Sequence, residues 1–356
     1  MPTLQITRTT VPRPRVADPD LGFGQVFTDH ILVLDYTQEA GWQNARIEPY
    51  GPFTLDPATL VFHYGQAVFE GFKAFRSDSG GVVLFRPADH IARLNASCGR
   101  LCIPPLDESL VLDAVKALVR LDADWVPRTF GCSLYIRPCI IATEAGLGVR
   151  PSKTYRFFTI MSPVGAYYRE GFRPVRILVS DRYARAVKGG LGAAKTPANY
   201  AASLLAEQEA KAAGFTQVLW LDGVERRYVE EVGTMNIFFR LGDELVTAPL
   251  EGTILAGITR DSVIRLAHQW GLRVSERRLS VAEILEAHAG GRLQEVFGSG
   301  TAAVISPVAE LRFAECSLTV NQGRVGAWTQ RLFETLTGIQ YGKIEDPFGW
   351  TLPILP

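Results

Sequence analysis

A lysine stands between a glycine-rich loop and a segment of helical character at residues 189–200. The loop contains Gly189, Gly190 and Gly192, and glycines let a backbone approach a bulky partner closely. The lysine is Lys195, and in a closed pocket a lysine has a lowered pKa and can form a Schiff base with a carbonyl group. Seen alone, Lys195 is explained as well by a solvated loop, because most lysines are exposed.

Two adjacent acids, Glu230 and Glu231, lead directly into the apolar segment 232–238. A carboxylate at the edge of an apolar strand is partly buried, and a buried charge needs a partner. One suitable partner is the nitrogen of a pyridine ring, because an acid beside that nitrogen makes the ring an electron sink. A solvated turn before a strand is the alternative explanation of the same pair.

Two further segments have the form of anion-binding turns. At residues 255–261 a turn containing Gly257 opens a helix, whose first amides lack helical acceptors and favour an anion. At residues 297–303 a strand runs into Gly298-Ser299-Gly300-Thr301, which presents amides and two hydroxyls. This turn lacks the third glycine and the downstream acid of a dinucleotide-binding unit, which excludes a Rossmann fold. Together the four segments supply what a pyridoxal-phosphate site needs: a lysine, an acid for the ring nitrogen and two phosphate-binding turns.

The hydrophobic pattern predicts the elements that position these segments. Helices are expected at about 88–101, 110–121, 199–213, 258–270 and 280–288, and strands at 26–34, 82–85, 133–136, 155–161, 175–180, 218–221 and 235–239. Because strands come in clusters without regular βαβ alternation, we predict the α+β class. The 356 residues suffice for two domains. We expect a small N-terminal α/β domain at 1–168, beginning with a loose arm at 1–22, then a linker at 169–182 and a large C-terminal domain with Lys195 at 183–356.

Composition excludes several classes of function. Lysine plus arginine and aspartate plus glutamate both number 37, so the positive surplus that binds nucleic acid or an anionic membrane is missing. The five cysteines form no C-x-x-C pair, and the five histidines show no zinc-binding spacing. The N-terminus has no signal-peptide pattern and no apolar run spans a bilayer, so we expect a cytoplasmic protein without a metal site.

Several motifs, taken together and in order, resemble those of branched-chain amino-acid aminotransferases of fold type IV. The resemblance covers most of the chain, from about residue 23 to residue 342. It rests on F-E-G-F-K-A-F at 69–75, S-L-Y-I-R-P at 133–138, P-V-G-A-Y-Y at 163–168, K-T-P-A-N-Y at 195–200, Q-V-L-W-L at 217–221, E-V-G-T-M-N at 231–236 and F-G-S-G-T-A at 297–302. It implies a two-domain fold of the D-amino-acid-aminotransferase type, with the site at the domain interface.

The resemblance also implies roles in binding pyridoxal 5′-phosphate. Lys195 would form the Schiff base, Glu231 would pair with the ring nitrogen and Tyr200 would donate to the ring hydroxyl oxygen. Arg93 would reach the phosphate, and Leu255 would pack on the ring face. The remaining cofactor contacts would come from Thr234, Gly257, Ile258, Thr259 and Thr301.

For the substrate, the resemblance implies an apolar pocket with a few polar anchors. Its residues would be Phe23, Tyr64, Phe69, Tyr135, Arg137, Val149, Tyr167, Thr301 and Ala302. Arg137 has a particular task, because one guanidinium beside an apolar pocket can bind the distal carboxylate of glutamate without spoiling the site for leucine. A structural arginine is the alternative. The family forms homodimers in which Tyr64 and Val149 reach across the interface, and we expect the same here.

The implied reaction is reversible amino transfer between L-leucine, L-isoleucine or L-valine and 2-oxoglutarate, giving branched 2-oxo acids and L-glutamate. D-amino-acid aminotransferases and aminodeoxychorismate lyases are rivals within the fold, but they are usually shorter and do not combine S-L-Y-x-R-P with V-G-T-M-N. A silent cofactor-binding homologue and a plain phosphate-binding protein are further rivals. The sequence departs from animal members of the family, whose Gly-Thr-Ala turn continues into a C-x-x-C redox pair, because Ala303 and Ser306 stand at those positions.

Overall fold

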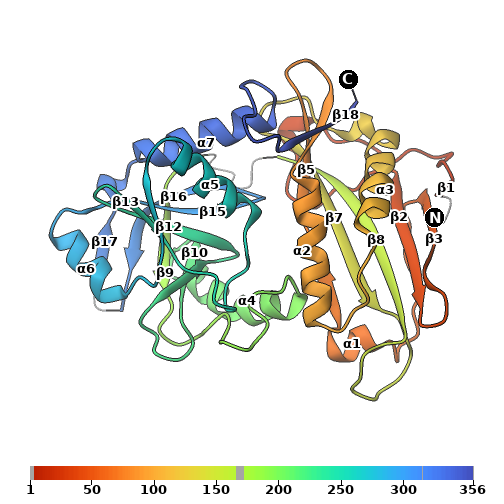
Figure 1. Cartoon of the computed structure of the whole chain (residues 1–356), viewed down its shortest axis with the longest axis horizontal. Coiled ribbons are helices and arrows are strands. Elements are labelled where there is room, and N and C mark those ends of the chain that lie inside the picture. The colour runs from red at the N-terminus through yellow and green to blue at the C-terminus, as the bar shows by residue number, and fades with distance from the viewer. Residues whose placement is uncertain (1–3, 166–171, 315, 356) are drawn as a thin grey trace. The chain divides into compact units, whose positions relative to one another are not determined.

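The computed structural model describes residues 4–165, 172–314 and 316–355. The chain divides into two compact units. The first unit comprises Met1–Tyr167, Ala194–Pro197 and Gly338–Pro356, and the second comprises Tyr168–Ala193 and Ala198–Thr337. Mixed sheets with helices make up both units, so the predicted α+β class is confirmed (Figure 1).

This division differs from the expected boundaries in three places. Lys195 belongs to the first unit, although the sequence suggested the second. The C-terminal residues also return to the first unit, because β18 (Thr351–Leu355) pairs with β6 (Val82–Phe85). The expected linker contains β9 (Val175–Val179), a strand with neighbours on both sides, while residues 169–171 lie outside the described part.

A nine-stranded sheet forms the centre of the first unit. Its order is β1 (Gln5–Ile6), β3 (Gly41–Pro49), β2 (His30–Thr37), β8 (Thr154–Val164), β7 (Ser133–Ala142), β5 (Phe72–Arg76), β6 and β18, and β4 (Ala67–Phe69) pairs with β7. The stretch expected to be a loose arm contains β1, which pairs with β3. Short 3-10 turns occur at Asp18–Asp20 and Ala123–Trp125.

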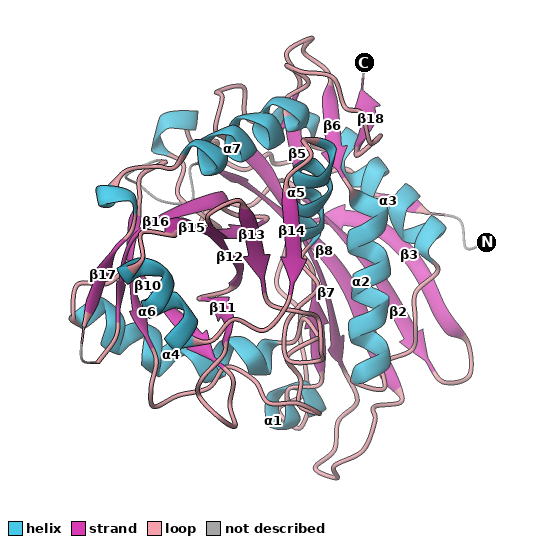
Figure 2. Cartoon of the chain, turned by 60° about the vertical axis from the view of Figure 1, so that its left-hand side comes forward, coloured by secondary structure: helices cyan, strands magenta, loops and turns pink. Residues whose placement is uncertain are grey.

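Two helices, α2 (Pro87–Arg100) and α3 (Glu108–Leu121), lie side by side against this sheet (Figures 1 and 2). The Asp107 side chain caps α3 by accepting the N–H groups of Ser109 and Leu110, as helix N-terminal acids commonly do. The apolar stripe of α3 packs into one core with the sheet, which confirms the helical periodicity predicted for 110–121. Cys98 is buried in that core, but Cys102 lies beyond the end of α2 and is exposed. The short helix α1 (Leu60–Tyr64) completes the unit's helices among the described residues.

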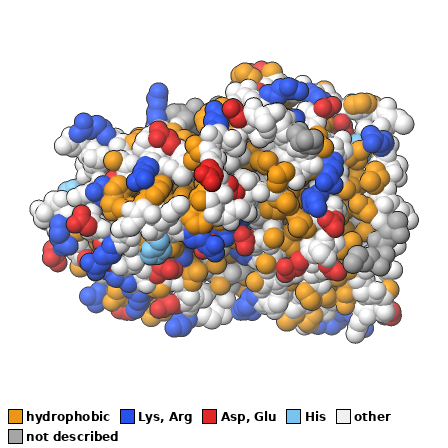
Figure 3. All heavy atoms as spheres, turned by 45° about the horizontal axis from the view of Figure 1, so that its top comes forward, with side chains coloured by type: hydrophobic (Ala, Val, Ile, Leu, Met, Phe, Trp, Pro, Cys, Tyr) orange, Lys and Arg blue, Asp and Glu red, His pale blue; other side chains and the backbone are white. Residues whose placement is uncertain are grey.

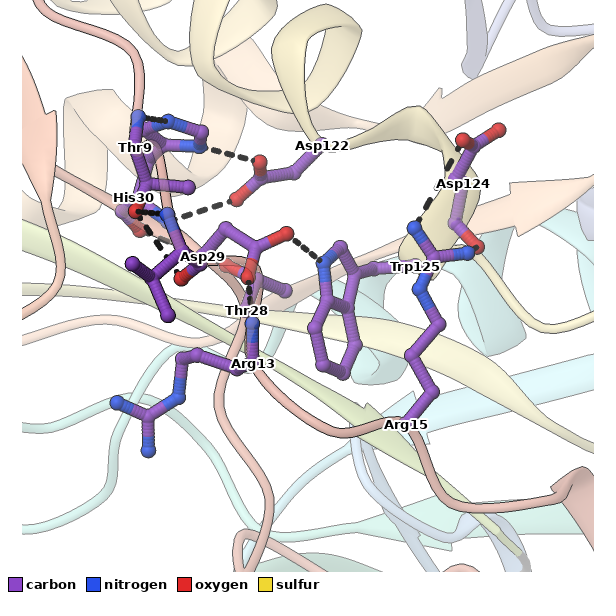
Figure 4. Close-up of polar contacts among 10 residues, drawn as sticks. Thr9, Arg13, Arg15, Thr28, Asp29, His30, Asp122, Asp124 and Trp125 are labelled. Carbon is purple, nitrogen blue, oxygen red and sulfur yellow. Dashed lines mark hydrogen bonds and ion pairs between the residues drawn. The ribbon is translucent and has the colours of Figure 1, made fainter.

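A buried histidine fixes the segment before β2 to the first unit (Figure 4). The Thr9 backbone N–H donates to His30 Nε2 at 2.9 Å, so this nitrogen is the acceptor and the ring proton sits on Nδ1. Nδ1 in turn lies 2.6 Å from the Asp122 carboxylate. The neighbouring Asp29 accepts the backbone N–H of Arg13 at 2.7 Å. The N-terminal segment is therefore held by side-chain acceptors as well as by strand pairing.

The sheet of the second unit closes on itself. Its order is β11 (Val229–Val232), β10 (Gln217–Leu221), β9, β16 (Val304–Arg312), β15 (Leu293–Gly300), β12 (Met235–Leu241), β13 (Glu244–Thr247) and β14 (Arg273–Glu276), and β17 (Ser317–Thr319) pairs with β16. An additional pairing of β11 with β12 joins the two ends of the first six strands into a ring. The apolar residues of this ring pack with those of α6 (Val281–Ala289) into one core.

Helix α4 (Pro197–Ala212) follows Lys195 directly, and α5 (Ile258–Gln269) follows the turn that contains Gly257. These helices and α6 lie where the sequence predicted them, although α4 begins at Pro197, two residues before the predicted start at 199. The helix α7 (Ala327–Gln340) and the turn Asn321–Gly323 were not predicted.

On the face drawn in Figure 3, basic and acidic side chains are interspersed, in keeping with equal numbers of each. None of the helices in the described ranges combines the length and hydrophobicity needed to cross a bilayer.

Candidate functional site

The backbone around Lys195 is attached to the first unit by three hydrogen bonds. Its N–H donates to the Ser97 hydroxyl on α2 at 2.9 Å, and its carbonyl accepts the N–H of Phe69 at 3.0 Å. The hydroxyl of Thr196 donates to the Ala67 carbonyl on β4 at 2.9 Å. The short segment from the C-terminal half of the sequence is thus fixed between a strand and a helix of the N-terminal half.

The Lys195 amine lies in an environment that disfavours its charge. Burial and, next, the positive charge of Arg93 lower its pKa to about 8, while Glu70 opposes the shift. Its nitrogen lies 4.9 Å from the centre of the Phe69 ring. With a pKa near 8, a useful fraction of the amine is neutral and nucleophilic close to neutral pH.

Glu70 holds Arg93 in a fixed orientation. Its carboxylate accepts Arg93 Nε at 2.7 Å and Nη2 at 2.9 Å, the bidentate geometry that suits a guanidinium. His90 Nδ1 lies 2.9 Å from the same carboxylate, and the Gly71 N–H donates to it at 3.1 Å. Burial raises the pKa of Glu70, but the neighbouring Arg93 and His90 outweigh it and hold the pKa far below the ordinary value.

No role was predicted for Glu70 or His90, although Glu70 lies inside the motif at 69–75. One signal was available for Glu70, because an acid between Phe69 and Gly71 in an apolar stretch must have a buried partner. The identity of that partner depends on tertiary structure, since Arg93 lies 23 residues away.

Among the predicted substrate residues of the first unit, three aromatic rings and one arginine lie close together: Phe23, Phe69, Tyr135 and Arg137. The Arg137 guanidinium lies 4.7 Å from the Phe69 ring centre, and its Nη2 donates to the Tyr135 hydroxyl at 3.0 Å. The rings of Phe23 and Tyr135 meet edge to face at 5.1 Å. A Cβ at Gly71 would lie 1.8 Å from the Tyr135 hydroxyl oxygen, so only glycine allows this ring its place. The structure therefore brings these predicted residues into one cluster with the Lys195 amine.

Three predicted substrate residues lie apart from this cluster or outside the described residues. Tyr64 is 42% exposed and donates its hydroxyl to the Leu147 carbonyl, and Val149 on the same loop is 84% exposed. Tyr167 lies outside the described residues.

In the second unit, Glu231 lies on β11 and is only 2% exposed. Arg185 Nη1 lies 2.6 Å from its Oε2, and the Asn236 amide donates to its Oε1 at 3.1 Å. The same amide donates to the Leu255 carbonyl at 3.0 Å, and Arg185 Nη1 donates to the Thr253 carbonyl at 3.1 Å. The carboxylate is therefore oriented by a cation and an amide. Neither Arg185 nor Asn236 was assigned a role from the sequence.

Several other predicted residues of the second unit lie next to Asn236. Strand register sets Glu231 opposite Asn236, and Asn236 opposite Ser299 on β15. The turn at Thr301 and Ala302 follows immediately. A Cβ at Gly257 would come within 2.0 Å of the Asn236 side-chain oxygen, so the turn that opens α5 needs glycine there.

Four further predicted residues of the second unit lie on α5, on α4 and in the turn between β11 and β12. Ile258 and Thr259 form the first turn of α5, where backbone N–H groups lack helical acceptors. Tyr200 is partly buried on α4, and Thr234 is exposed in the turn between β11 and β12.

The chain is similar to known proteins along most of its length. The family model for class IV amino-transferases matches residues 67–311. The chain is 53% identical over 352 residues to branched-chain-amino-acid aminotransferase 2 of Bacillus subtilis, covering 99% of this chain and 97% of that protein. Among solved structures, the branched-chain aminotransferase of Escherichia coli matches with a TM-score of 0.78 at 29% identity, covering 92% of this chain and 99% of that one.

A branched-chain aminotransferase from the archaeon Thermoproteus uzoniensis, solved with norvaline, matches with a TM-score of 0.75 at 26% identity, covering 91% of this chain and 99% of that chain. The family match covers more than half of the chain, and the Bacillus relative is similar along nearly its whole length. The chain therefore belongs to the class IV aminotransferases and, within them, to the branched-chain-amino-acid aminotransferases.

Proposed function

We propose that this protein transfers amino groups reversibly between L-leucine, L-isoleucine or L-valine and 2-oxoglutarate, with pyridoxal 5′-phosphate attached at Lys195. The observation that carries the proposal is the Lys195 amine, which lies beside Arg93 and over the Phe69 ring with its pKa lowered to about 8. An amine in this state attacks carbonyl carbon and moves protons near neutral pH.

Each unit supplies groups of the kinds that this cofactor requires. Glu231, held by Arg185 and Asn236, supplies the anion that a ring nitrogen requires. The phosphate has an arginine in Arg93, and amides at Ile258, Thr259 and the turn at Thr301, the kinds of group that bind phosphate in proteins. Tyr200 would donate to the ring hydroxyl oxygen, Leu255 and Gly257 would lie against the ring and its phosphate, and Thr234 would complete the set.

When bound, pyridoxal phosphate supplies an electron sink for the charge left on the substrate Cα. Lys195 is the base that removes the Cα proton and the acid that returns a proton, and its lowered pKa suits it to both tasks. The Glu231 carboxylate supports the reaction by keeping a positive ring nitrogen favourable. Arg93, fixed by Glu70, keeps the site positive where an anionic group must bind.

The substrate pocket would be formed by the aromatic cluster of the first unit. Phe23, Phe69 and Tyr135 provide apolar surface for a branched side chain, and Arg137 provides a cation for the distal carboxylate of 2-oxoglutarate. Thr301 and Ala302 would bind the α-carboxylate through their amides, and Tyr167 would lie at the pocket edge.

We also propose a homodimer in which a second copy completes the pocket. The exposure of Tyr64 and Val149, 42% and 84%, supports this proposal, because large apolar side chains of this exposure often belong to an interface.

The test is the visible absorption spectrum of the purified protein with L-leucine and then with 2-oxoglutarate. A yellow band that is lost with L-leucine and regained with 2-oxoglutarate is expected. A band that responds to D-alanine but not to L-leucine would assign the protein to the D-amino-acid branch. No band after incubation with pyridoxal phosphate would contradict the proposal.

A further inference from the structure

Glu230, the neighbour of Glu231 on β11, belongs to a different site. Successive residues of a strand point to opposite faces, so the two carboxylates diverge. Glu230 lines a cavity of about 240 Å³ within the second unit. The cavity lies between the end of β10, the start of β11 and the loop that leads from β13 toward α5, and its apolar wall includes Val229, Pro249 and Ile254.

The Glu230 side chain is an unsatisfied group in this cavity. The residue is 8% exposed, and its Oε2 has no hydrogen-bond partner in the described part of the chain. Burial raises its pKa, an effect that a hydrogen bond from Thr253 only partly offsets. A buried carboxylate oxygen without a donor costs free energy, and a ligand that brings a donor recovers it.

Two other acids of the cavity, Asp222 and Glu225, are already engaged. Asp222 accepts the backbone N–H groups of Glu225, Arg227 and Tyr228, at 2.7 to 2.9 Å. Glu225 pairs with Arg278 at 3.2 Å, and the Arg278 guanidinium lies 3.6 Å from the centre of the Tyr228 ring. Asp222 and Glu225 therefore have less to offer a ligand than Glu230 has.

Lys188 supplies a cation at the lining of the same cavity. It is exposed, and no hydrogen bond or ion pair joins it to another of the described residues. The cavity thus offers an inner carboxylate, an outer ammonium and an apolar wall between acidic and basic groups. A ligand with an ammonium group at its inner end and a carboxylate at its outer end would complement this cavity.

We propose that this cavity binds a small aliphatic α-amino acid outside the catalytic centre. Its ammonium donates to Glu230 Oε2, its carboxylate pairs with Lys188, and its side chain lies against Val229, Pro249 and Ile254. Arg185 links this cavity to Glu231. It pairs with the Glu231 carboxylate and also donates to the carbonyl of Thr253, which lines the cavity.

The experiment is calorimetric titration of the holoprotein with 1-aminocyclopentane-1-carboxylate. This amino acid has no Cα hydrogen, so it is not turned over and its binding in the cavity does not depend on transamination. We expect Glu230→Gln to weaken one class of binding about tenfold or more, because a charge-assisted hydrogen bond is lost. Lys188→Gln should weaken the same class severalfold.

The matched control is Glu251→Gln, since Glu251 lines the cavity but is exposed. It should leave the affinity unchanged. Thermal melting of each variant separates lost binding from lost folding, and Lys188→Gln, at an exposed position, provides a second measurement if Glu230→Gln melts early.

Three outcomes would overturn the proposal. An affinity that Glu230→Gln does not change, or no binding to any form, would exclude an amino-acid site in this cavity. Isopentylamine that binds as tightly as the amino acid, with no effect of Lys188→Gln, would show that the occupant is a simple amine. Failure of the aminotransferase proposal would instead appear in the absorption test and leave this titration intact.

Discussion

In the candidate site of each unit a buried glutamate pairs with an arginine, and the two pairs serve opposite purposes. In the first unit Glu70 binds Arg93 through two guanidinium nitrogens and is also approached by His90 and the Gly71 N–H. In the second unit Arg185 approaches Glu231 at 2.6 Å. By the roles proposed above, the arginine is the functional member of the first pair and the carboxylate is that of the second.

The difference shows how a chain can hold one buried charged group in place for function by pairing it with another. A buried ion is tolerated only when it is paired and hydrogen-bonded. Glu70 is saturated by donors from its own surroundings, so it serves as a structural holder for Arg93. Glu231 shares the Asn236 amide with the carbonyl of Leu255, which ties the carboxylate to the turn that leads into α5.

The largest expected effect comes from removing the group that both pairs are proposed to support. Lys195→Ala should lower kcat for L-leucine and 2-oxoglutarate by about 10⁴-fold or more, because the proton-transferring amine is lost. Steady-state kinetics measure the effect, and a melting temperature close to wild type is the control for folding. Transamination within about tenfold of wild type would refute the role of Lys195.

Matched substitutions in the two pairs should separate their purposes. Glu231→Gln should lower kcat by about 10²-fold, because the ring nitrogen loses its anion. It should destabilise the fold less than Glu70→Gln, because Arg185 keeps the carbonyls of Thr253 and Gly192 as hydrogen-bond acceptors. Glu70→Gln should lower the free energy of unfolding by about 3 kcal/mol, because Arg93 keeps no buried counter-ion. Kinetics and urea unfolding of both variants make the comparison. If Glu231→Gln were the variant that unfolds early, the contrast between the pairs would be broken.

The Glu70 pair should also give stability a particular pH dependence. The pKa of Glu70 in the folded chain lies below its ordinary value of 4.5, so ionised Glu70 stabilises the fold above that pH. This stability is lost as the pH falls below 4.5 toward the folded-state pKa. The stability gap between wild type and Glu70→Gln should therefore be widest near neutral pH and shrink in acid, which unfolding curves at several pH values measure.

Arg137→Gln should change one substrate and spare the other. We expect KM for 2-oxoglutarate to rise by about tenfold or more, since a charge-assisted contact to the distal carboxylate is lost. KM for L-leucine should stay within about twofold, because its apolar side chain makes no such contact. Equal loss for both substrates would instead make Arg137 a structural residue that orders the Phe69 and Tyr135 rings.

The smallest expected effect is a shift in the pKa of Lys195 in the cofactor-free protein. Amine-labelling rates should show a midpoint near pH 8, well below the ordinary value of 10.5. Arg93→Met should raise the midpoint by removing a like charge, and Glu70→Gln should lower it by removing an opposite one. Shifts of the same sign in both variants would contradict the electrostatic account of the Lys195 amine.

Local chemistry allowed much of the site to be predicted from sequence. Lys195 and Glu231 stand in segments whose residue types are costly to explain otherwise, and the turn at Gly257 opens a helix as expected. No roles were assigned to the residues that orient Arg93 and Glu231, because strand pairing and helix packing decide which partner a buried charge has. These residues are Glu70, Arg185 and Asn236. Arg185 lies 46 positions before Glu231, and no local pattern links them.

The fold shows the same limit. Helices with a clear apolar period, such as α3 and α5, were predicted within a few residues. The pairing of β18 with β6 and the ring formed by β11 and β12 were not, because register between distant strands leaves no local periodicity. The hydrogen bonds of the Lys195 backbone with Ser97 and Phe69 were not predicted for the same reason, since both residues are remote in sequence.

The pairing of β18 with β6 has a consequence for synthesis on the ribosome. β6 is complete by Phe85, but its partner strand begins only at Thr351. Until β18 has left the exit tunnel, the β6 edge of the first sheet therefore lacks its native neighbour. An unpaired edge can recruit strands from other nascent chains, so this sheet depends on rapid elongation or on chaperone protection until β18 emerges.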